Sequence, residues 1–173
     1  ETLEALSAFL GENPDSDHYL IDYIDYKPPD GLFRKYRFIF IEGEILPSHL
    51  AIGDTWKVHH VNTDMINQRW MQGEEAAFLE DPTRYFSPAN MAGLKAISRA
   101  FDLSYCGVDC GLTRDGELVV FEVNASMLVH QHNEDMPYKT PHVARIKAVF
   151  DEMLRTKVEI ECGRSPPRLL TTP

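Results

Sequence analysis

The strongest local signal in the chain is Asp115-Gly116, which lies between two runs of strand-forming residues. A two-residue type I′ turn needs positive φ at both central positions, and Asp-Gly satisfies this need well. If these two residues form the turn, each residue before it faces the residue at the same distance after it. The sequence therefore predicts a hairpin over residues 105–124 with a defined register.

This register divides the hairpin into an apolar face and a second, more polar face. On the apolar face the predicted pairs are Val108 with Val123, Cys110 with Phe121, and Leu112 with Val119. On the second face they are Gly107 with Asn124, Asp109 with Glu122, and Gly111 with Val120. Because one face is wholly apolar, the pattern supports the register independently of the turn.

Two carboxylates, Asp109 and Glu122, thus face each other on one side of the hairpin. Like charges directly opposite each other are destabilising, so a compensating group is expected. Mg²⁺ binds carboxylate oxygens, and Asn124 offers an amide oxygen on the same face. Gly107 and Gly111 are expected to leave room above the sheet for a bulky ligand. The alternatives are a solvated edge hairpin and a carboxyl pair that shares one proton.

The remaining pattern predicts an α+β domain, in which an antiparallel sheet of hairpins is covered by helices on one face. Apolar spacing, caps and turn residues predict helices over residues 2–10, 74–79, 88–101 and 141–154. Aromatic and β-branched runs predict strands over residues 18–24, 36–41, 44–52 and 56–61.

Composition excludes several classes of partner. The chain has 17 basic and 27 acidic residues, a net charge of −10, and no basic run, so nucleic acid is not an expected partner. No apolar run approaches the roughly 20 residues that span a bilayer, and no signal peptide is recognisable. We therefore expect a cytoplasmic protein without a membrane partner. The first residue is not methionine and the end is rich in proline, so a piece of a longer protein is expected.

The hairpin sequence resembles the metal-binding end of the ATP-grasp superfamily, which includes glutathione synthetases, D-alanine ligases and glutamate ligases. The matching segments are Gly107-Val108-Asp109, the Asp-Gly turn and Phe121-Glu122-Val123-Asn124-Ala125-Ser126. The resemblance implies that Asp109, Glu122 and Asn124 bind the Mg²⁺ or Mn²⁺ ions that bridge the phosphates of ATP. It also implies that the fold corresponds to the C-terminal part of an ATP-grasp domain.

Three further segments follow the same family order. Residues 19–24 resemble the hinge strand that clamps adenine, which implies nucleotide contacts from Ile21, Asp22, Tyr23 and Ile24. Lys35-Tyr36-Arg37 resembles the strand whose arginine reaches the transferred phosphate, so Lys35 and Arg37 are expected to bind the nucleotide and Arg37 to act in catalysis. Lys57 lies in the place of a basic strand near the phosphates and is also expected to be catalytic.

Other details are closest to ATP-grasp-like domains that follow tetratricopeptide repeats in bacterial proteins. They are Ile24-Asp25-Tyr26, Pro29-Asp30-Gly31 and Met136-Pro137-Tyr138-Lys139. The family also uses a lysine and a glycine-rich loop before the hinge, and this chain has only the residue 2–10 helix there. We therefore expect residues 1–155 to be an ATP-grasp-like domain without its N-terminal part, residues 156–173 to be a tail, and a preceding domain of the same longer chain to be a partner.

The resemblance implies an ATP-dependent carboxylate-amine ligase that acts through an acyl phosphate in the full-length protein, and we expect this fragment alone to be inactive. Its partners would be ATP and small-molecule or peptide carboxylate and amine substrates. Two alternatives stay open: a nucleotide-binding or interaction module that is catalytically incomplete, and a kinase with the same nucleotide clamp. His130-Gln131-His132 with Glu134 and Asp135 could hold a transition metal, but a polar loop is the simpler interpretation. Of His59 and His60, only one can face a site on a strand.

Overall fold

The computed structural model describes residues 2–19, 21–59, 62–130 and 134–162. This part of the chain is an α+β domain, as the sequence predicts. The elements, in chain order, are α1 (Leu3–Glu12), β1 (Phe33–Ile41), β2 (Glu44–Gly53), α2 (Arg69–Glu80), η2 (Pro82–Arg84), α3 (Pro88–Phe101), β3 (Tyr105–Leu112), β4 (Leu118–Asn124), η3 (Pro137–Lys139) and α4 (Thr140–Glu161).

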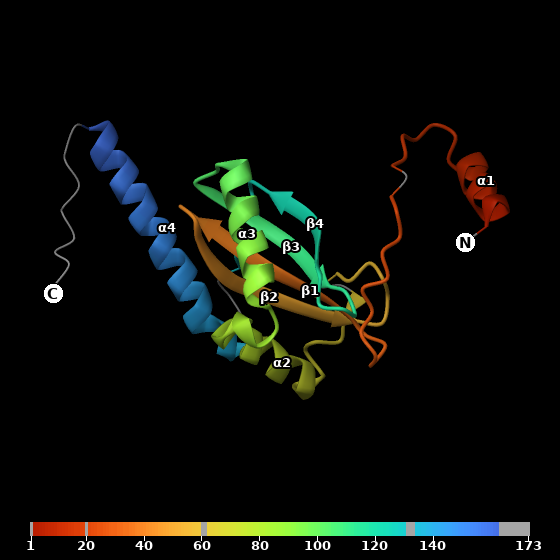
Figure 1. The fold of residues 1–173 in the computed structure, drawn as a ribbon, viewed down its shortest axis with the longest axis horizontal. Helices are drawn as coiled ribbons and strands as arrows, with labels where there is room; N and C mark the ends of the chain where they lie inside the picture. Colours follow the sequence, from red (N-terminus) through yellow and green to blue (C-terminus); the bar gives the residue numbers. More distant parts are fainter. Residues whose placement is uncertain (1, 20, 60–61, 131–133, 163–173) are drawn as a thin grey trace.

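The four strands form one antiparallel sheet in the order β2-β1-β3-β4 (Figure 1). The two predicted hairpins, β1-β2 and β3-β4, are both present. They join through the antiparallel pairing of β1 with β3, so the first strand of one hairpin lies beside the first strand of the other. This central pairing brings β1 next to the strand that carries Asp109.

One face of the sheet packs against α2 and α3 through the main hydrophobic cluster. Its largest fully buried members are Phe38, Phe40, Phe78, Phe86, Leu50, Ile52, Leu94 and Val108. The helix α3 begins as predicted, because Ser87 and Asn90 form a reciprocal capping box and Pro88 occupies the first turn. This face therefore supplies most of the apolar burial that stabilises the domain.

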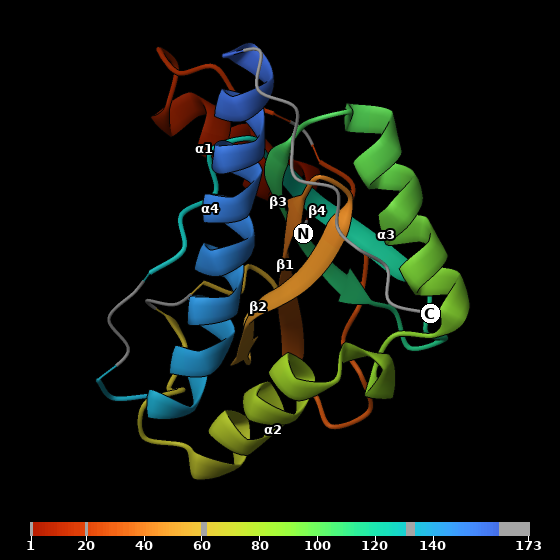
Figure 2. The ribbon, with the colours of Figure 1, turned by 90° about the vertical axis from the view of Figure 1, so that its left-hand side faces the viewer.

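The opposite face carries two smaller apolar clusters with a gap between them. One cluster packs against α4 and contains Ile39, Ile41, Leu46, Met127, Ile146 and Met153. The other contains Tyr26, Phe33, Ala51 and Val58. Figure 2 shows the sheet between α4 and α3, so helices cover both faces and the expectation of one covered face is wrong.

Within the part of the chain that the structure describes, two predicted strands are not formed. Residues 21–24 are exposed coil, residues 56 and 57 belong to a bend, and residues 58 and 59 are coil, while Leu20, His60 and Val61 lie outside the described residues. The Trp56 indole Nε1 donates to the Ile24 carbonyl at 3.1 Å, and the Tyr26 hydroxyl donates to the Trp56 carbonyl at 2.7 Å. These aromatic segments therefore contact each other and do not pair with a strand of the sheet. Strand-forming residues adopt a strand only where a neighbouring strand is available to pair with them.

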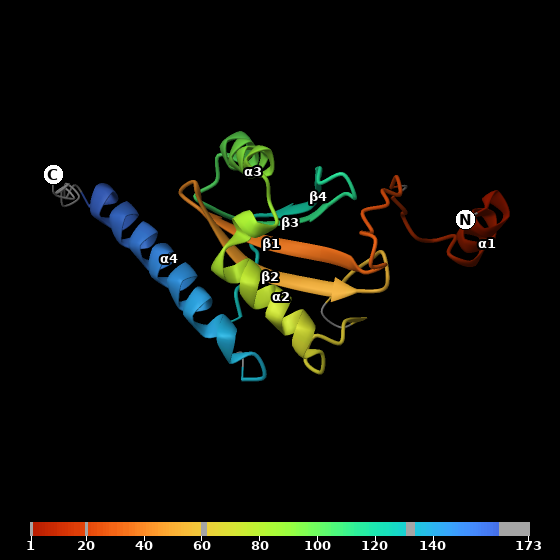
Figure 3. The same cartoon turned by 60° about the horizontal axis from the view of Figure 1, so that its bottom comes forward.

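The ends of the chain also differ from expectation. The helix α4 continues to Glu161, so the predicted tail begins inside a helix, and residues 163–173 lie outside the described part. The predicted N-terminal helix is present as α1, but none of its residues is buried, and it lies away from the sheet (Figures 1 and 3). None of the described helices combines the length and the apolar character needed to cross a membrane.

Candidate functional site

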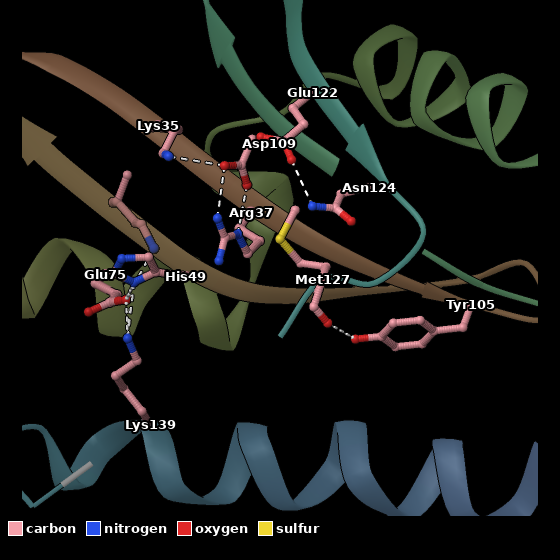
Figure 4. Close-up of polar contacts among 11 residues, drawn as sticks. Lys35, Arg37, His49, Glu75, Tyr105, Asp109, Glu122, Asn124, Met127 and Lys139 are labelled. Carbon is pink, nitrogen blue, oxygen red and sulfur yellow. Dashed lines mark hydrogen bonds and ion pairs between the residues drawn. The ribbon is translucent and has the colours of Figure 1, made fainter. Parts of the chain in front are cut away.

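A line of polar residues crosses all four strands on the face between the two smaller apolar clusters. His49 of β2 pairs with Arg37 of β1, Arg37 pairs with Asp109 of β3, and Asp109 pairs with Glu122 of β4. We call these four residues the polar row (Figure 4). Directly paired residues point to the same face of a sheet, so the row is a consequence of register.

The predicted facing of Asp109 and Glu122 is confirmed, together with the Gly107–Asn124 and Val108–Val123 pairs. The other three predicted pairs are wrong. The pairs that form are Cys110 with Val120, Gly111 with Val119, and Leu112 with Leu118.

A longer loop and a bulge in this hairpin have opposite effects on its register. In the turn, Gly116 has φ of 78°, but Asp115 does not have the positive φ that a type I′ turn requires. The Thr113 and Glu117 backbone pair closes a longer loop, which shifts the register by one residue. A bulge next to Asp109 then adds one residue to β4 and restores the predicted register at the site.

Asp109 is held by two cationic side chains from β1. Arg37 Nε donates to Asp109 Oδ1 at 2.7 Å, and Arg37 Nη2 donates to Oδ2 at 2.9 Å. The Lys35 Nζ lies 3.0 Å from Oδ2, and the Asp109 side chain is only 2% exposed. Burial alone would raise the pKa of Asp109, but the hydrogen bonds and charges of Arg37 and Lys35 outweigh it and lower this pKa.

These cations supply the compensation that the sequence argument assigned to a metal ion. Arg37 and Lys35 both lie within β1, which begins at Phe33, three residues earlier than the predicted strand. A bidentate guanidinium pair is the strongest common arrangement for a carboxylate, and here it is largely shielded from water. Arg37 therefore stabilises the fold as well as lining the site.

Glu122 and Asn124 lie beside this pair on the neighbouring strand. The Asn124 Nδ2 donates to Glu122 Oε1 at 2.8 Å, and the Ser126 backbone N–H donates to Asn124 Oδ1 at 2.8 Å. Two carboxylates and one amide are hard oxygen donors, and Mg²⁺ commonly takes one or two carboxylates with waters and phosphates. The residue types therefore fit Mg²⁺, although within the described residues no three His, Cys, Asp or Glu side chains are grouped to hold a metal.

The structure does not leave the predicted space above the two glycines of β3. A Cβ at Gly107 would lie 2.4 Å from the Cβ and Cγ of Met127. A Cβ at Gly111 would lie 2.8 Å from the Phe121 ring and 3.0 Å from the Tyr26 ring. Side chains of the protein therefore fill the room that the sequence argument reserved for a ligand.

A buried acidic residue at the other end of the polar row was not anticipated. Glu75 of α2 is fully buried, and its carboxylate accepts from the Leu50 backbone N–H at 3.1 Å and from Lys139 Nζ at 2.9 Å. It also accepts from the Tyr138 hydroxyl at 2.5 Å and contacts His49 Nδ1 at 2.5 Å. We call His49, Glu75, Tyr138 and Lys139 the Glu75 cluster.

Charge and hydrogen bonding hold Glu75 ionised despite its burial. Burial favours the neutral acid, but His49, Lys139 and Tyr138 together lower the pKa of Glu75 to about 2. The sequence did contain a signal for this residue. Glu75 follows Met71 by four residues and precedes Phe78 and Leu79, so it occupies a core position of an otherwise amphipathic helix.

The remaining predicted site residues lie apart from the polar row or are exposed. Ile21, Asp22, Tyr23 and Ile24 are exposed coil residues, and Tyr23 packs against the Trp56 ring at 5.7 Å between centroids. Lys57 is exposed in a bend. His59 and His130 are also exposed, whereas His60, Gln131 and His132 lie outside the described residues. The structure thus brings together Lys35, Arg37, Asp109, Glu122 and Asn124 only.

An apolar cavity of about 440 Å³ opens beside this group, between the segment after β4 and α4. Met127, Ile146 and Phe150 line it, and Ser126 and Lys147 add polar atoms.

Comparison of the whole chain with family models, with curated proteins and with solved structures finds no significant match.

Proposed function

We propose that the polar row, with Lys35 and Asn124, is the phosphate- and metal-binding part of an ATP- and Mg²⁺-dependent carboxylate-amine ligase. The observation that carries the proposal is the placement of two carboxylates, an amide and two cations on one face of three adjacent strands. Phosphoryl transfer needs cationic groups and hard oxygen ligands together, because charge must be neutralised on both substrate and metal.

Each residue has a definite task in this proposal. Asp109, Glu122 and Asn124 would hold Mg²⁺, which when bound would neutralise phosphate charge. Arg37 offers a planar fork of donors that matches phosphate oxygens, and Lys35 adds a second cation beside it. Arg37 would stabilise the charge that develops while a substrate carboxylate takes the terminal phosphoryl group. An amine would then displace phosphate from the acyl phosphate.

The adenine contacts of residues 21–24 and the catalytic role of Lys57 belong to the same proposal. These residues are exposed, so the proposal requires them to approach the nucleotide when it binds. A cytoplasmic location also stays a prediction.

A nucleotide-binding or interaction module without turnover is the second candidate. The observation in its favour is that Arg37 and Lys35 both pair with Asp109. Cations engaged in this way stabilise the sheet and must change partner before they can bind phosphate. This candidate predicts nucleotide or metal binding without release of phosphate.

The metal site can be tested on this chain with Mn²⁺, by calorimetry or by paramagnetic line broadening. We expect the Asp109→Asn, Glu122→Gln double variant to bind Mn²⁺ at least tenfold more weakly than the wild type. The matched control is Asp151→Asn, Glu152→Gln, which removes two exposed acids from α4 and should bind Mn²⁺ as the wild type does. Equal binding by all three proteins contradicts the site.

Nucleotide binding can be followed with a fluorescent ATP analogue, with and without Mg²⁺. Because the chain carries a net charge of −10, ATP should bind only when Mg²⁺ is present. We expect a dissociation constant on the order of 1 mM, or about −4 kcal/mol. Micromolar binding that does not depend on a metal would contradict the proposed arrangement.

A further inference from the structure

The Glu75 cluster fixes the position of one proton on His49. The His49 Nδ1 and Glu75 Oε1 lie 2.5 Å apart, which is a hydrogen-bond distance. Two lone pairs this close would repel each other, so the hydrogen must lie between them and Nδ1 must donate to the carboxylate. Lys139 Nζ lies 2.9 Å from the same carboxylate oxygen and 3.0 Å from His49 Nδ1. Because Nδ1 carries the hydrogen that the shorter 2.5 Å contact requires, Lys139 donates to the carboxylate and not to the ring. In the neutral ring, the lone pair therefore lies on the second ring nitrogen, Nε2.

The surroundings of His49 favour a neutral ring. Burial lowers the pKa of His49, and the nearby charges of Lys139 on η3 and Arg37 on β1 lower it further. Glu75 on α2 acts in the opposite direction but does not reverse the shift. Tyr138, the other titratable group of the cluster, donates its hydroxyl to Glu75. A neutral imidazole with hydrogen on Nδ1 is a base at Nε2.

The location of His49 connects this base to the site. His49 is a member of the polar row and pairs directly with Arg37, so the two side chains lie side by side in Figure 4. Its side chain is 22% exposed, whereas Glu75 behind it is fully buried. A small molecule beside Arg37 can therefore reach His49 but not Glu75.

We propose that His49 is the general base that activates the amine substrate, and that Glu75 is the positioning residue that orients its ring. This proposal rests on the ligase function proposed above. The protonated amine gives one proton to His49 Nε2 and becomes nucleophilic. Its nitrogen attacks the acyl phosphate carbon, the new C–N bond forms, and the C–O bond to phosphate breaks. Phosphate leaves with the bonding electrons, and the second amine proton passes to solvent.

The first test measures the ring of His49 by ¹H–¹⁵N correlation NMR of the folded chain between pH 5 and 8. His49→Gln identifies the signals. We expect hydrogen on Nδ1 and a lone pair on Nε2 at neutral pH, and a partial loss of this tautomer in Glu75→Gln, with recovery in Glu75→Asp. A ring that is protonated on Nε2 at neutral pH has no base to offer and overturns the proposal, whatever the chain does with ATP.

The second test compares two nucleophiles in an assay of phosphate release from ATP by the full-length protein, with the common amino acids as carboxylate donors. Ammonia is protonated at neutral pH and needs a base, whereas hydroxylamine is largely unprotonated and does not. We expect His49→Gln to lower the ammonia rate by about 100-fold and the hydroxylamine rate by less than tenfold. The control is His18→Gln, which removes an exposed histidine outside the sheet.

The outcomes separate the two proposals. Equal loss with both nucleophiles means that His49 is structural and overturns its role as a base, while the ligase function stands. Absence of nucleophile-dependent phosphate release with every donor contradicts the ligase function, and the role of His49 falls with it. Selective loss with ammonia, together with the Nδ1–H tautomer, supports both.

Discussion

At the scale of single residues, Glu75 joins three elements that are far apart in the sequence. Its carboxylate binds the edge strand β2 through Leu50 and His49, and it binds η3 through Tyr138 and Lys139. A buried carboxylate is stable only when it has such partners, since removal from water otherwise costs several kcal/mol. The folded state therefore depends on the ionised form of Glu75.

This dependence gives a prediction for acid stability. The pKa of Glu75 is about 2 in the folded state, compared with an ordinary value of 4.5. The folded state binds fewer protons in this interval, so the stabilisation is complete above the ordinary value and is lost as pH falls toward 2. We expect urea unfolding to show a loss on the order of a few kcal/mol between these values, and a smaller loss in Glu75→Gln.

The comparison must separate Glu75 from other acids, such as Asp109, whose pKa is also lowered. Asp151→Asn removes an exposed carboxylate on α4 and should keep the wild-type pH dependence. If the Glu75→Gln variant also keeps the wild-type pH dependence, Glu75 is not the ionised group that stabilises the folded state.

Contacts of single residues could be predicted from the sequence only where both partners lie in one hairpin. The opposition of Asp109 and Glu122 could be predicted because both lie in one hairpin, where register is local. Their compensation by Arg37 and Lys35 could not, because it depends on the pairing of β1 with β3, strands whose Arg37 and Asp109 are 72 residues apart. The same limit applies to Lys139, which reaches Glu75 across 64 residues.

At the scale of elements, close packing on β3 gives a second prediction. A Cβ at Gly107 would lie 2.4 Å from Met127 atoms next to the backbone, which cannot move away easily. Gly107→Ala should therefore cost about 1–3 kcal/mol in the free energy of unfolding. Gly73 lies inside α2 with no atom within 4 Å of its added Cβ, so Gly73→Ala should stabilise by up to about 1 kcal/mol. Thermal or urea unfolding of both variants measures the difference.

A double variant provides the control for this explanation. Met127→Ala removes the atoms beyond Cβ and so relieves part of the contact, and Gly107→Ala should then cost less than it does in the wild-type background. Equal costs in both backgrounds would show that the packing of Met127 is not the cause.

The two hairpins illustrate what turn chemistry can and cannot predict. Glu42 and Gly43 both have positive φ, at 48° and 83°, so the tight turn occurs in the first hairpin. At Asp115-Gly116 only the glycine has positive φ, and the loop is longer. The predicted register at the site is correct because the bulge in β4 compensates for the longer loop, and a turn motif does not encode a bulge.

At the scale of the whole molecule, apolar periodicity predicts the amphipathic helices correctly. Runs of strand-forming residues predict strands correctly only within the two hairpins. Residues 33–53 and 105–124 have partners close in sequence, and both runs form strands. The run from His18 to Ile24 is also rich in strand-forming residues, but its described residues, which are all except Leu20, pair with no strand. Propensity therefore predicted strands only where a hairpin turn supplied the neighbour.

The same reasoning predicts how the N-terminal region contributes to stability. None of the residues of α1 is buried, and the apolar side chains Leu3, Leu6 and Phe9 are 79%, 41% and 49% exposed. The contacts that its residues make within the described chain include the Phe9 ring against His18, which belongs to the same segment. A variant that begins at Tyr19 should therefore unfold within about 0.5 kcal/mol of the full chain.

The matched control for this truncation is a substitution in the other terminal helix. Ile146 of α4 is buried against β1, β2 and Met127, so Ile146→Ala should cost about 2–5 kcal/mol. Urea unfolding followed by circular dichroism compares the two changes in one assay. A truncated chain that loses as much stability as Ile146→Ala would mean that α1 packs on the sheet in solution. Its exposed apolar face would then belong to the core of the domain and could not be a surface open to a partner.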